Sequence, residues 1–308
     1  MKKRTAALGL GLPLLGAGIF SAELYKYVFC REGSRLLSPL LDKKTHAPEY
    51  YAFRDSSASL LRQRPQTRFT LRSDRGEKLC GFYFPAGGSG KRIVFLIHGY
   101  RSEHAETAGM YFDYYASRGF DVFCCDHTAH GESGGRLIGF DRFECEDCLK
   151  WLDFLQDQFG RDIQVVLHGF SMGAATVMRM SDRCPACVRL LVEDSGYCSA
   201  QEQLRGQLGA AYPLMRLMHR VIAGYDLRDC DVRPSLSRCS LPVLFVHGRD
   251  DGTVPFDNAP RLYALYEGEK DCLYTEKARH VESMFAAPEA YAEKLDGMLR
   301  RYLGTAAV

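Results

Sequence analysis

The residues best suited to chemistry in this chain are Gly-Phe-Ser-Met-Gly at positions 169–173. An apolar run of β type, 163–168, precedes them, and a helix-forming run, 174–180, follows. In a strand–turn–helix context a G-x-S-x-G segment forms a nucleophile elbow, in which the serine sits on a tight, strained turn. Its glycines are required because a Cβ two residues before or after the serine would have no room. The pattern predicts Ser171 as a nucleophile.

A serine hydroxyl is a weak nucleophile at neutral pH, so the chemistry also requires a base and an acid. A histidine must accept the proton of the serine, and a carboxylate must fix the tautomer of that histidine. On such a scaffold the partners follow the serine in the order acid, then histidine, each in a loop after a later strand. The segment 247–255 supplies Asp250 and Asp251, and His280 comes later. The order predicts Ser171, one of these two aspartates, and His280 as a triad.

Eight other histidines compete with His280 for the role of the base. Only His280 lies beyond the acid in the sequence and in the loop where the base is expected. Four histidines adjoin other motifs and are expected to bond to loop backbone; they are His98, His130, His168 and His247. Spacing suggests no partner for the other four, which are His46, His104, His127 and His219.

The elements that must position these residues are alternating strands and helices from about residue 67 to 303. Segments 69–71 and 79–84 predict a hairpin, and further strands are predicted at 93–97, 120–125, 188–192, 243–246 and 272–274. The stretch 143–159 has the wide apolar stripe of a helix packed on a sheet. This alternation predicts an α/β domain, a mostly parallel sheet with helices on both faces and sites at the carboxyl ends of its strands. A helical interval at about 197–239 interrupts it and predicts a small helical lid.

Four motifs in register carry a resemblance to a known family. They are His98-Gly99-Tyr100 after a strand, residues 126–133 after the next strand, the elbow at Ser171, and residues 247–255. The chain resembles the α/β-hydrolases over about 67–303, and among them the cap-bearing serine hydrolases similar to monoacylglycerol lipases and serine aminopeptidases. Thr128 stands where such families usually have an arginine, a difference that affects a structural loop.

The resemblance implies roles for further residues. Its H-G-x-x-D-x-x-V-P pattern, matched from His247 onward, places the acid at Asp251, with Asp250 left to cap a turn or pair with Arg249; Asp194, after an earlier strand, is an outside alternative. The resemblance also implies that the backbone N–H groups of Tyr100 and Met172 form the oxyanion hole. No metal and no organic cofactor is required.

Charge and cysteine content give a second set of expectations. Lys+Arg number 40 and Asp+Glu 38, so no basic excess points to nucleic acid. Among 12 cysteines, the C-x-x-C pairs Cys145/Cys148 and Cys184/Cys187 lack the spacing and the neighbouring histidines of a zinc site. We expect reduced thiols packed as small apolar groups, with Cys184 and Cys187 able to pair in an oxidising compartment.

The amino terminus predicts membrane attachment. Lys2-Lys3-Arg4 is followed by the uncharged run 5–22, about the minimum for a bilayer span. We expect residues 1–22 to form an uncleaved signal anchor, with a signal peptide as the alternative, and 23–66 to form a juxtamembrane segment. The domain is then expected on the extracytoplasmic side, with a secreted form or the cytoplasmic face as alternatives.

These features predict a membrane-attached serine hydrolase that cleaves a carboxylic ester, thioester or amide of a small molecule through an acyl-enzyme on Ser171. An acyltransferase with the same triad, or a non-catalytic binding protein on the same fold, is the alternative. The sequence leaves the substrate and the oligomeric state open.

Overall fold

The computed structural model describes residues 3–42, 45–87 and 90–304, and in the first helix it describes side chains from Gly16 onward. One sheet in the order β1-β2-β4-β3-β5-β6-β7-β8 organises it. Its strands are β1 (Thr67–Arg72), β2 (Lys78–Phe84), β3 (Arg92–Ile97), β4 (Asp121–Asp126), β5 (Gln164–Phe170), β6 (Val188–Asp194), β7 (Val243–Gly248) and β8 (Lys270–Thr275).

The sheet is parallel from β4 to β8, and β1 and β2 form an antiparallel hairpin that joins it at β4. The central strands are apolar on both sides, as expected where helices cover both faces of a parallel sheet. All predicted strands are present within two residues of their expected ends. The predicted fold class, a mostly parallel sheet with helices on both faces, is therefore confirmed.

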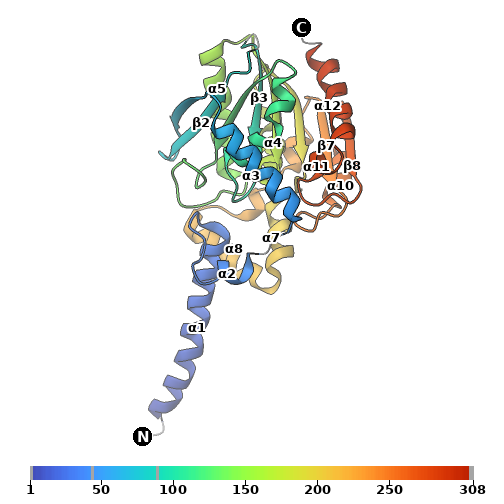
Figure 1. The fold of residues 1–308 in the computed structure, drawn as a ribbon. Helices are drawn as coiled ribbons and strands as arrows, with labels where there is room; N and C mark the ends of the chain where they lie inside the picture. The colour runs from blue at the N-terminus through green and yellow to red at the C-terminus, as the bar shows by residue number, and fades with distance from the viewer. Residues whose placement is uncertain (1–2, 43–44, 88–89, 305–308) are drawn as a thin grey trace.

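Helices cover the sheet on two sides (Figure 1). Buried residues of α5 and α6 pack on one face, and those of α4 and α12 pack on the other. The helices are α1 (Lys3–Phe29), α2 (Ser38–Leu41), α3 (Pro48–Arg62), α4 (His104–Ala116), α5 (Arg142–Phe159), α6 (Met172–Met180), α7 (Ala200–Leu208), α8 (Tyr212–Ala223), α9 (Arg233–Leu236), α10 (Asn258–Leu265), α11 (Ser283–Ala286) and α12 (Pro288–Leu303).

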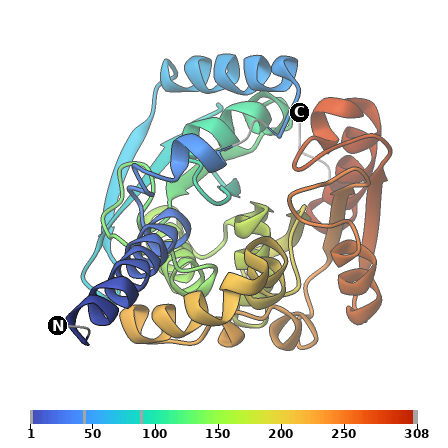
Figure 2. The ribbon, with the colours of Figure 1, turned by 90° about the horizontal axis from the view of Figure 1, so that it is seen from below.

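The segment predicted as juxtamembrane, 23–66, forms short helices that pack on the domain. The last turns of α1 bury Tyr25 and Phe29, and both rings contact His219 of α8. The helix α3 lies along α4, and Ala58 and Leu61 join the core on that side (Figure 2). These residues are part of the folded body of the protein.

The close approach of α3 to α4 depends on Gly109. A Cβ at Gly109 would lie 2.6 Å from the carbonyl carbon and oxygen of Ser57, closer than real Cβ atoms come to backbone. Replacing Gly109 with alanine must therefore push α3 away from α4. We expect Gly109→Ala to lower the free energy of unfolding by about 1–3 kcal/mol, the usual cost of overpacking. Denaturant unfolding measures this, and Gly297→Ala on α12, where a Cβ meets no atom within 4 Å, is the matched control.

The interval 197–239 is helical, as predicted, and contains α7, α8 and α9 with two short 3₁₀ turns between them, at Gly209–Ala211 and Leu227–Asp229. Ser199 begins α7 by accepting a hydrogen bond from the Glu202 N–H at 3.2 Å, which is the usual role of a serine N-cap. The helices α7 and α8 follow the carboxyl end of β6 and lie at the same end of the molecule as α2 (Figure 1).

Most of the predicted anchor, residues 1–22, lies outside the residues whose side chains are described. Within the described residues, no helix combines the length and the apolar character that crossing a bilayer requires.

Candidate active site

The turn between β5 and α6 holds Ser171 in a strained conformation. Its φ of 55° and ψ of −116° fall in a region that side-chain-bearing residues rarely adopt. The turn is tight because the backbone at Gly169 and at Gly173 lies directly against other backbone atoms. A Cβ at Gly169 would lie 2.2 Å from the Gly173 oxygen, and a Cβ at Gly173 would lie 2.1 Å from the Ile97 oxygen. The predicted steric reason for the two glycines is confirmed.

Three of the predicted site residues meet at this turn. His280 Nε2 lies 2.8 Å from Ser171 Oγ, and His280 Nδ1 lies 2.7 Å from Asp251 Oδ2. The Asp251 carboxylate accepts from Nδ1–H, which leaves Nε2 to accept from the serine hydroxyl. Residues more than a hundred positions apart are thus joined in one chain of hydrogen bonds.

The loop after β7 fixes Asp251 on both oxygens. Oδ1 accepts from the N–H groups of Thr253 and Val254, each at 2.8 Å, and Oδ2 also lies 3.2 Å from His247 Nε2. Burial alone would raise the pKa of Asp251, but the charge of His280 and the hydrogen bonds from both histidines outweigh it and hold this pKa well below its usual value. Asp251 therefore stays ionised.

The other two aspartates do not reach His280. Asp250 is exposed, and Arg249 pairs with Glu276 at 2.6 Å and not with Asp250 as the sequence had suggested. Asp194 is fully buried and binds the hydroxyls of Ser195 and Tyr291 at 2.9 and 3.0 Å. Burial raises the pKa of Asp194 to about 6, although these hydrogen bonds oppose the shift.

Tyr100 and Met172 both adjoin the serine. Met172 opens α6, and the N–H groups of a first helical turn have no acceptor within the helix. Tyr100 follows Gly99, where a Cβ would lie 3.7 Å from Ser171 Oγ. Within the described residues, neither the Tyr100 nor the Met172 N–H has a hydrogen-bond acceptor. The Tyr100 hydroxyl points elsewhere and donates to the Val28 carbonyl at 2.9 Å.

A small cavity of about 160 Å³ opens beside Ser171 and His280. One wall comes from the loop after β3 and from α4, and another comes from the amino-terminal segment through His46, Tyr50 and Arg54. Sequence reasoning missed this second wall, because it treated residues 23–66 as lying outside the domain. The clusters Tyr50-Tyr51 and Tyr25-Lys26-Tyr27 were the available signal, since large aromatic residues are costly to leave in water.

The amino-terminal segment also holds the loop that carries His280. His46 Nδ1 lies 2.7 Å from Glu282 Oε1, and the Tyr50 hydroxyl donates to the Val281 carbonyl at 3.4 Å. From the opposite side, the Val281 N–H donates to Ser195 Oγ at 3.2 Å. The loop of His280 is therefore held between two sets of neighbours, one from the amino-terminal segment and one from the turn after β6.

A further buried acid, Glu193, lies next to Asp194 near the end of β6. It is fully buried; its Oε2 accepts from the Gly196 N–H at 3.0 Å, and its Oε1 has no partner among the described residues. Burial raises the pKa of Glu193 to about 8, although His247 and the Gly196 amide act in the opposite direction.

This raised pKa predicts how stability depends on pH. The folded protein keeps a proton on Glu193 that the unfolded chain loses near its ordinary pKa of 4.5, so stability falls as the pH rises from about 4.5 to about 8. We expect Glu193→Gln to reduce this fall and to unfold at a higher temperature than the parent at about pH 8.5, but not at about pH 5. Thermal unfolding at both pH values measures this. Glu267→Gln, at an exposed position, should leave the pH dependence unchanged.

The remaining histidines are held in structural roles, but the prediction for His168 is wrong, because it bonds to the hydroxyls of Tyr115 and Tyr291, each at 3.0 Å, and not to loop backbone. His98 Nδ1 donates to the Gly99 carbonyl at 2.7 Å, and its Nε2 accepts from the His127 N–H at 3.0 Å. The four histidines without an expected partner all have one: His46 contacts Glu282, His104 contacts Asp126, His127 contacts the His98 carbonyl and His219 contacts Tyr25.

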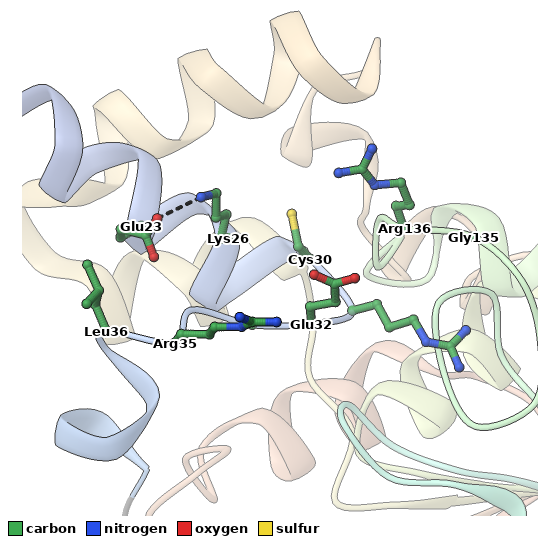
Figure 3. Close-up of a pocket in the computed structure, with 10 residues that line it drawn as sticks. Glu23, Lys26, Cys30, Glu32, Arg35, Leu36, Gly135 and Arg136 are labelled. Atoms are coloured by element: carbon green, nitrogen blue, oxygen red, sulfur yellow. Dashed lines mark hydrogen bonds and ion pairs between the residues drawn. The ribbon is translucent and has the colours of Figure 1, made fainter.

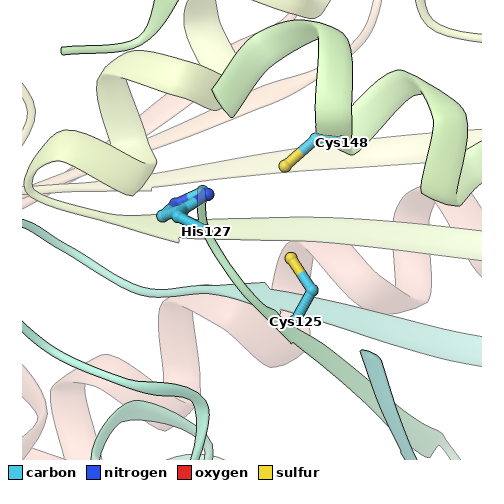
Figure 4. Close-up of side chains that lie close together, drawn as sticks. All are labelled: Cys125, His127 and Cys148. Carbon is cyan, nitrogen blue, oxygen red and sulfur yellow. The ribbon is translucent and has the colours of Figure 1, made fainter. Parts of the chain in front are cut away.

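The cysteines are all free thiols, including Cys184 and Cys187. A buried cluster brings Cys148, one member of the Cys145/Cys148 pair, together with Cys125 and His127, and their ligand atoms lie within 4.8 Å of one another (Figure 4). It offers three donors, whereas structural zinc sites almost always use four.

Comparison with known proteins agrees with this geometry. The serine aminopeptidase S33 family matches residues 88–228. The uncharacterised protein YqkD of Bacillus subtilis is 24% identical over 246 residues, 77% of this chain and 80% of its own length. The lysophosphatidylserine lipase ABHD12 of Danio rerio is 25% identical over 191 residues, 56% of this chain but 47% of its own length.

Solved structures match the same domain. The esterase Pf2001 of Pyrococcus furiosus superposes with a TM-score of 0.65 at 19% identity, over 85% of this chain and 98% of that one. The esterase domain of a Rhodothermus marinus protein gives 0.59 at 21% identity, over 78% and 100%. With the sheet order, these matches show the α/β-hydrolase fold.

Proposed function

We propose that this chain, which has the α/β-hydrolase fold, is a hydrolase that cleaves a carboxylic ester, thioester or amide through an acyl-enzyme on Ser171. The observation that carries this proposal is the continuous chain of hydrogen bonds from Ser171 through His280 to Asp251, at 2.8 and 2.7 Å. A histidine and a carboxylate at these distances are the groups that activate a serine hydroxyl.

In the first half of the reaction, Ser171 Oγ attacks the substrate carbonyl carbon while its proton passes to His280 Nε2. The bond to the leaving group then breaks, and His280 gives this proton to the departing oxygen, sulfur or nitrogen. In the second half, a water molecule attacks the acyl-enzyme and its proton passes to His280. Ser171 leaves with that proton, and the free acid departs.

Asp251 stays ionised throughout and stabilises the imidazolium that forms at His280. The negative charge that develops on the carbonyl oxygen is stabilised by the unpaired N–H groups of Tyr100 and Met172. These groups belong to two different elements, and the glycine-lined turn holds them at a fixed spacing, so little reorganisation is needed during the reaction.

The surrounding segments have proposed roles as well. Residues 197–239 would act as a lid, because they follow the carboxyl end of β6, the strand between those that lead to Ser171 and Asp251. Residues 1–22 would attach the protein to a membrane, with the domain on the extracytoplasmic side. Support for the second role comes from the sequence, which has no charged residue between Arg4 and Glu23.

A fluorophosphonate probe tests the proposed chemistry, because it reacts only with an activated serine. We expect the folded protein to be labelled at Ser171, as located by peptide mass spectrometry. Folded protein that remains unlabelled would overturn the proposal. Rates with short and long p-nitrophenyl esters and with aminoacyl amides then distinguish an esterase from a peptidase.

A further inference from the structure

One end of the molecule exposes large apolar side chains in unusual number. Eleven large hydrophobic residues are exposed in the described part of the chain, and all but Leu60 and Phe285 lie on or beside α1, α2 and α8. We call this surface the basal face; its exposed apolar residues are Ile19, Phe20, Leu36, Leu40, Leu41, Leu214, Leu217, Val221 and Ile222. Scattered exposed leucines are ordinary, but a group of this size marks an interaction surface.

The three elements of the basal face are joined to one another. Tyr25 of α1 contacts His219 of α8, with ring centroids 6.1 Å apart, and the Tyr27 hydroxyl donates to Asp42 at the end of α2 at 3.0 Å. Figure 1 shows α1, α2 and α8 at the same end of the molecule, and Figure 2 shows α1 beside α8. The helix α1 projects from this same end of the molecule (Figure 1).

Much of the apolar side of α8 is turned away from the protein. Tyr212, Met215 and His219 face the protein, whereas Leu214, Leu217 and Val221 lie at helical spacing on the opposite side and are 47, 60 and 77% exposed. A helix that only packs on a domain turns its apolar side toward the core. The outer apolar side of α8 therefore needs a second apolar environment.

A basic cavity of about 490 Å³ lies next to the apolar residues (Figure 3). It is lined by the cations Lys26, Arg31, Arg35 and Arg136 and by the acids Glu23 and Glu32. Glu23 is already bound to Lys26 and to the Ser34 hydroxyl, each at 2.7 Å.

The positive charge of this cavity is not neutralised from within. Arg31 donates to the carbonyls of Gly131 and Ser133, which carry no net charge, and within the described residues neither Arg35 nor Arg136 has a carboxylate partner. Arg220 on α8 also lacks one. A polar, positively charged rim beside an apolar patch is complementary to the phosphates and acyl chains of an anionic bilayer.

From this arrangement we propose that the basal face docks the folded domain on an anionic phospholipid bilayer. The outer side of α8 and the residues around α2 enter the headgroup and upper acyl region, and lipid phosphates bind at Arg35 and Arg136. This extends the proposed attachment through residues 1–22, but it is independent of the proposed hydrolysis. A second copy of the chain is a poorer occupant, because a symmetric contact would bring these same cations together.

The test uses the full chain in nanodiscs that contain a phosphatidylcholine with a photoreactive acyl chain, with and without phosphatidylglycerol. After irradiation, mass spectrometry locates the lipid adducts. We expect adducts in residues 214–222 and 36–41, with several-fold more when phosphatidylglycerol is present. Adducts confined to residues 1–22 would overturn the proposal, because they would show a tether without docking. A dimer whose α8 takes up no lipid would overturn it in favour of a second copy.

Matched variants make the test specific. Leu217→Glu with Val221→Glu should remove the adducts at α8, while Leu60→Glu on α3, at a leucine also 60% exposed, should not change them. Arg35→Gln with Arg136→Gln should remove the dependence on phosphatidylglycerol while adducts in the first residues remain. Unchanged thermal unfolding in each variant shows that the body is intact. If the α8 double variant keeps its adducts, the proposal is wrong.

Discussion

Replacing Ser171 with alanine is expected to lower kcat/KM by roughly 10⁴- to 10⁶-fold, measured as initial rates with an activated ester such as p-nitrophenyl acetate. The side chain removed is the only hydroxyl in contact with His280 Nε2 in the described structure, at 2.8 Å. Without it no acyl-enzyme can form. The residual rate should come from the Tyr100 and Met172 amides, which still stabilise an oxyanion if water attacks directly.

The Ser171→Ala protein should fold, because the alanine keeps the Cβ that the turn already accommodates. It should also lose labelling by fluorophosphonate. Ser237→Ala, at an exposed serine in the 197–239 segment, serves as the control and should keep parent activity. Parent turnover by Ser171→Ala would mean that the nucleophile lies elsewhere, and the proposed mechanism would then fail.

The meeting of Ser171 with Asp251 and His280 could be predicted because its signals are local. The elbow is five consecutive residues between a strand and a helix, and each partner lies in a loop directly after a strand. Parallel strands bring the loops after their carboxyl ends to one edge of the sheet. Neighbouring positions of β5, β7 and β8 in this sheet, with β6 between the first two, then bring the three side chains within reach.

The wall formed by His46, Tyr50 and Arg54 could not be predicted in the same way. These residues precede the first strand by more than ten positions, and no motif connects them to the loop of His280. Their place follows from the packing of α3 on α4, which depends on the absence of a side chain at Gly109. A single glycine in a helix carries little information by itself, so this contact becomes visible only in three dimensions.

His247 makes a second contact that the sequence could not predict. The sequence placed it in a motif shoulder and predicted a bond to loop backbone, and its Nε2 does lie 3.0 Å from the Val254 carbonyl. The same nitrogen also lies 3.2 Å from Asp251 Oδ2. Asp251 therefore faces two imidazoles, and a spacing of four residues within one loop does not reveal that both reach the same oxygen.

Replacing Asp251 with asparagine is expected to lower kcat/KM by roughly 10³- to 10⁴-fold. The asparagine carbonyl can keep the bonds from the Thr253 and Val254 N–H groups. Its NH₂ group then faces His280 Nδ1 and cannot accept from it. The imidazole is driven to the tautomer with its proton on Nε2, where it can no longer accept the proton of Ser171. Rates with the same activated ester measure the loss.

The adjacent residue provides the matched control, because Asp250→Asn makes the same chemical change one position away. Asp250 is exposed, and its carboxylate has no partner within the described residues, so this variant should keep activity within about twofold, as surface substitutions usually do. If Asp250→Asn lost activity while Asp251→Asn kept it, the acid would be misassigned. If both variants kept parent rates, His280 would not need the Asp251 carboxylate to hold its tautomer. Asp194 would then be the next residue to replace, because it bonds to Tyr291 and to Ser195, and Ser195 holds the His280 loop.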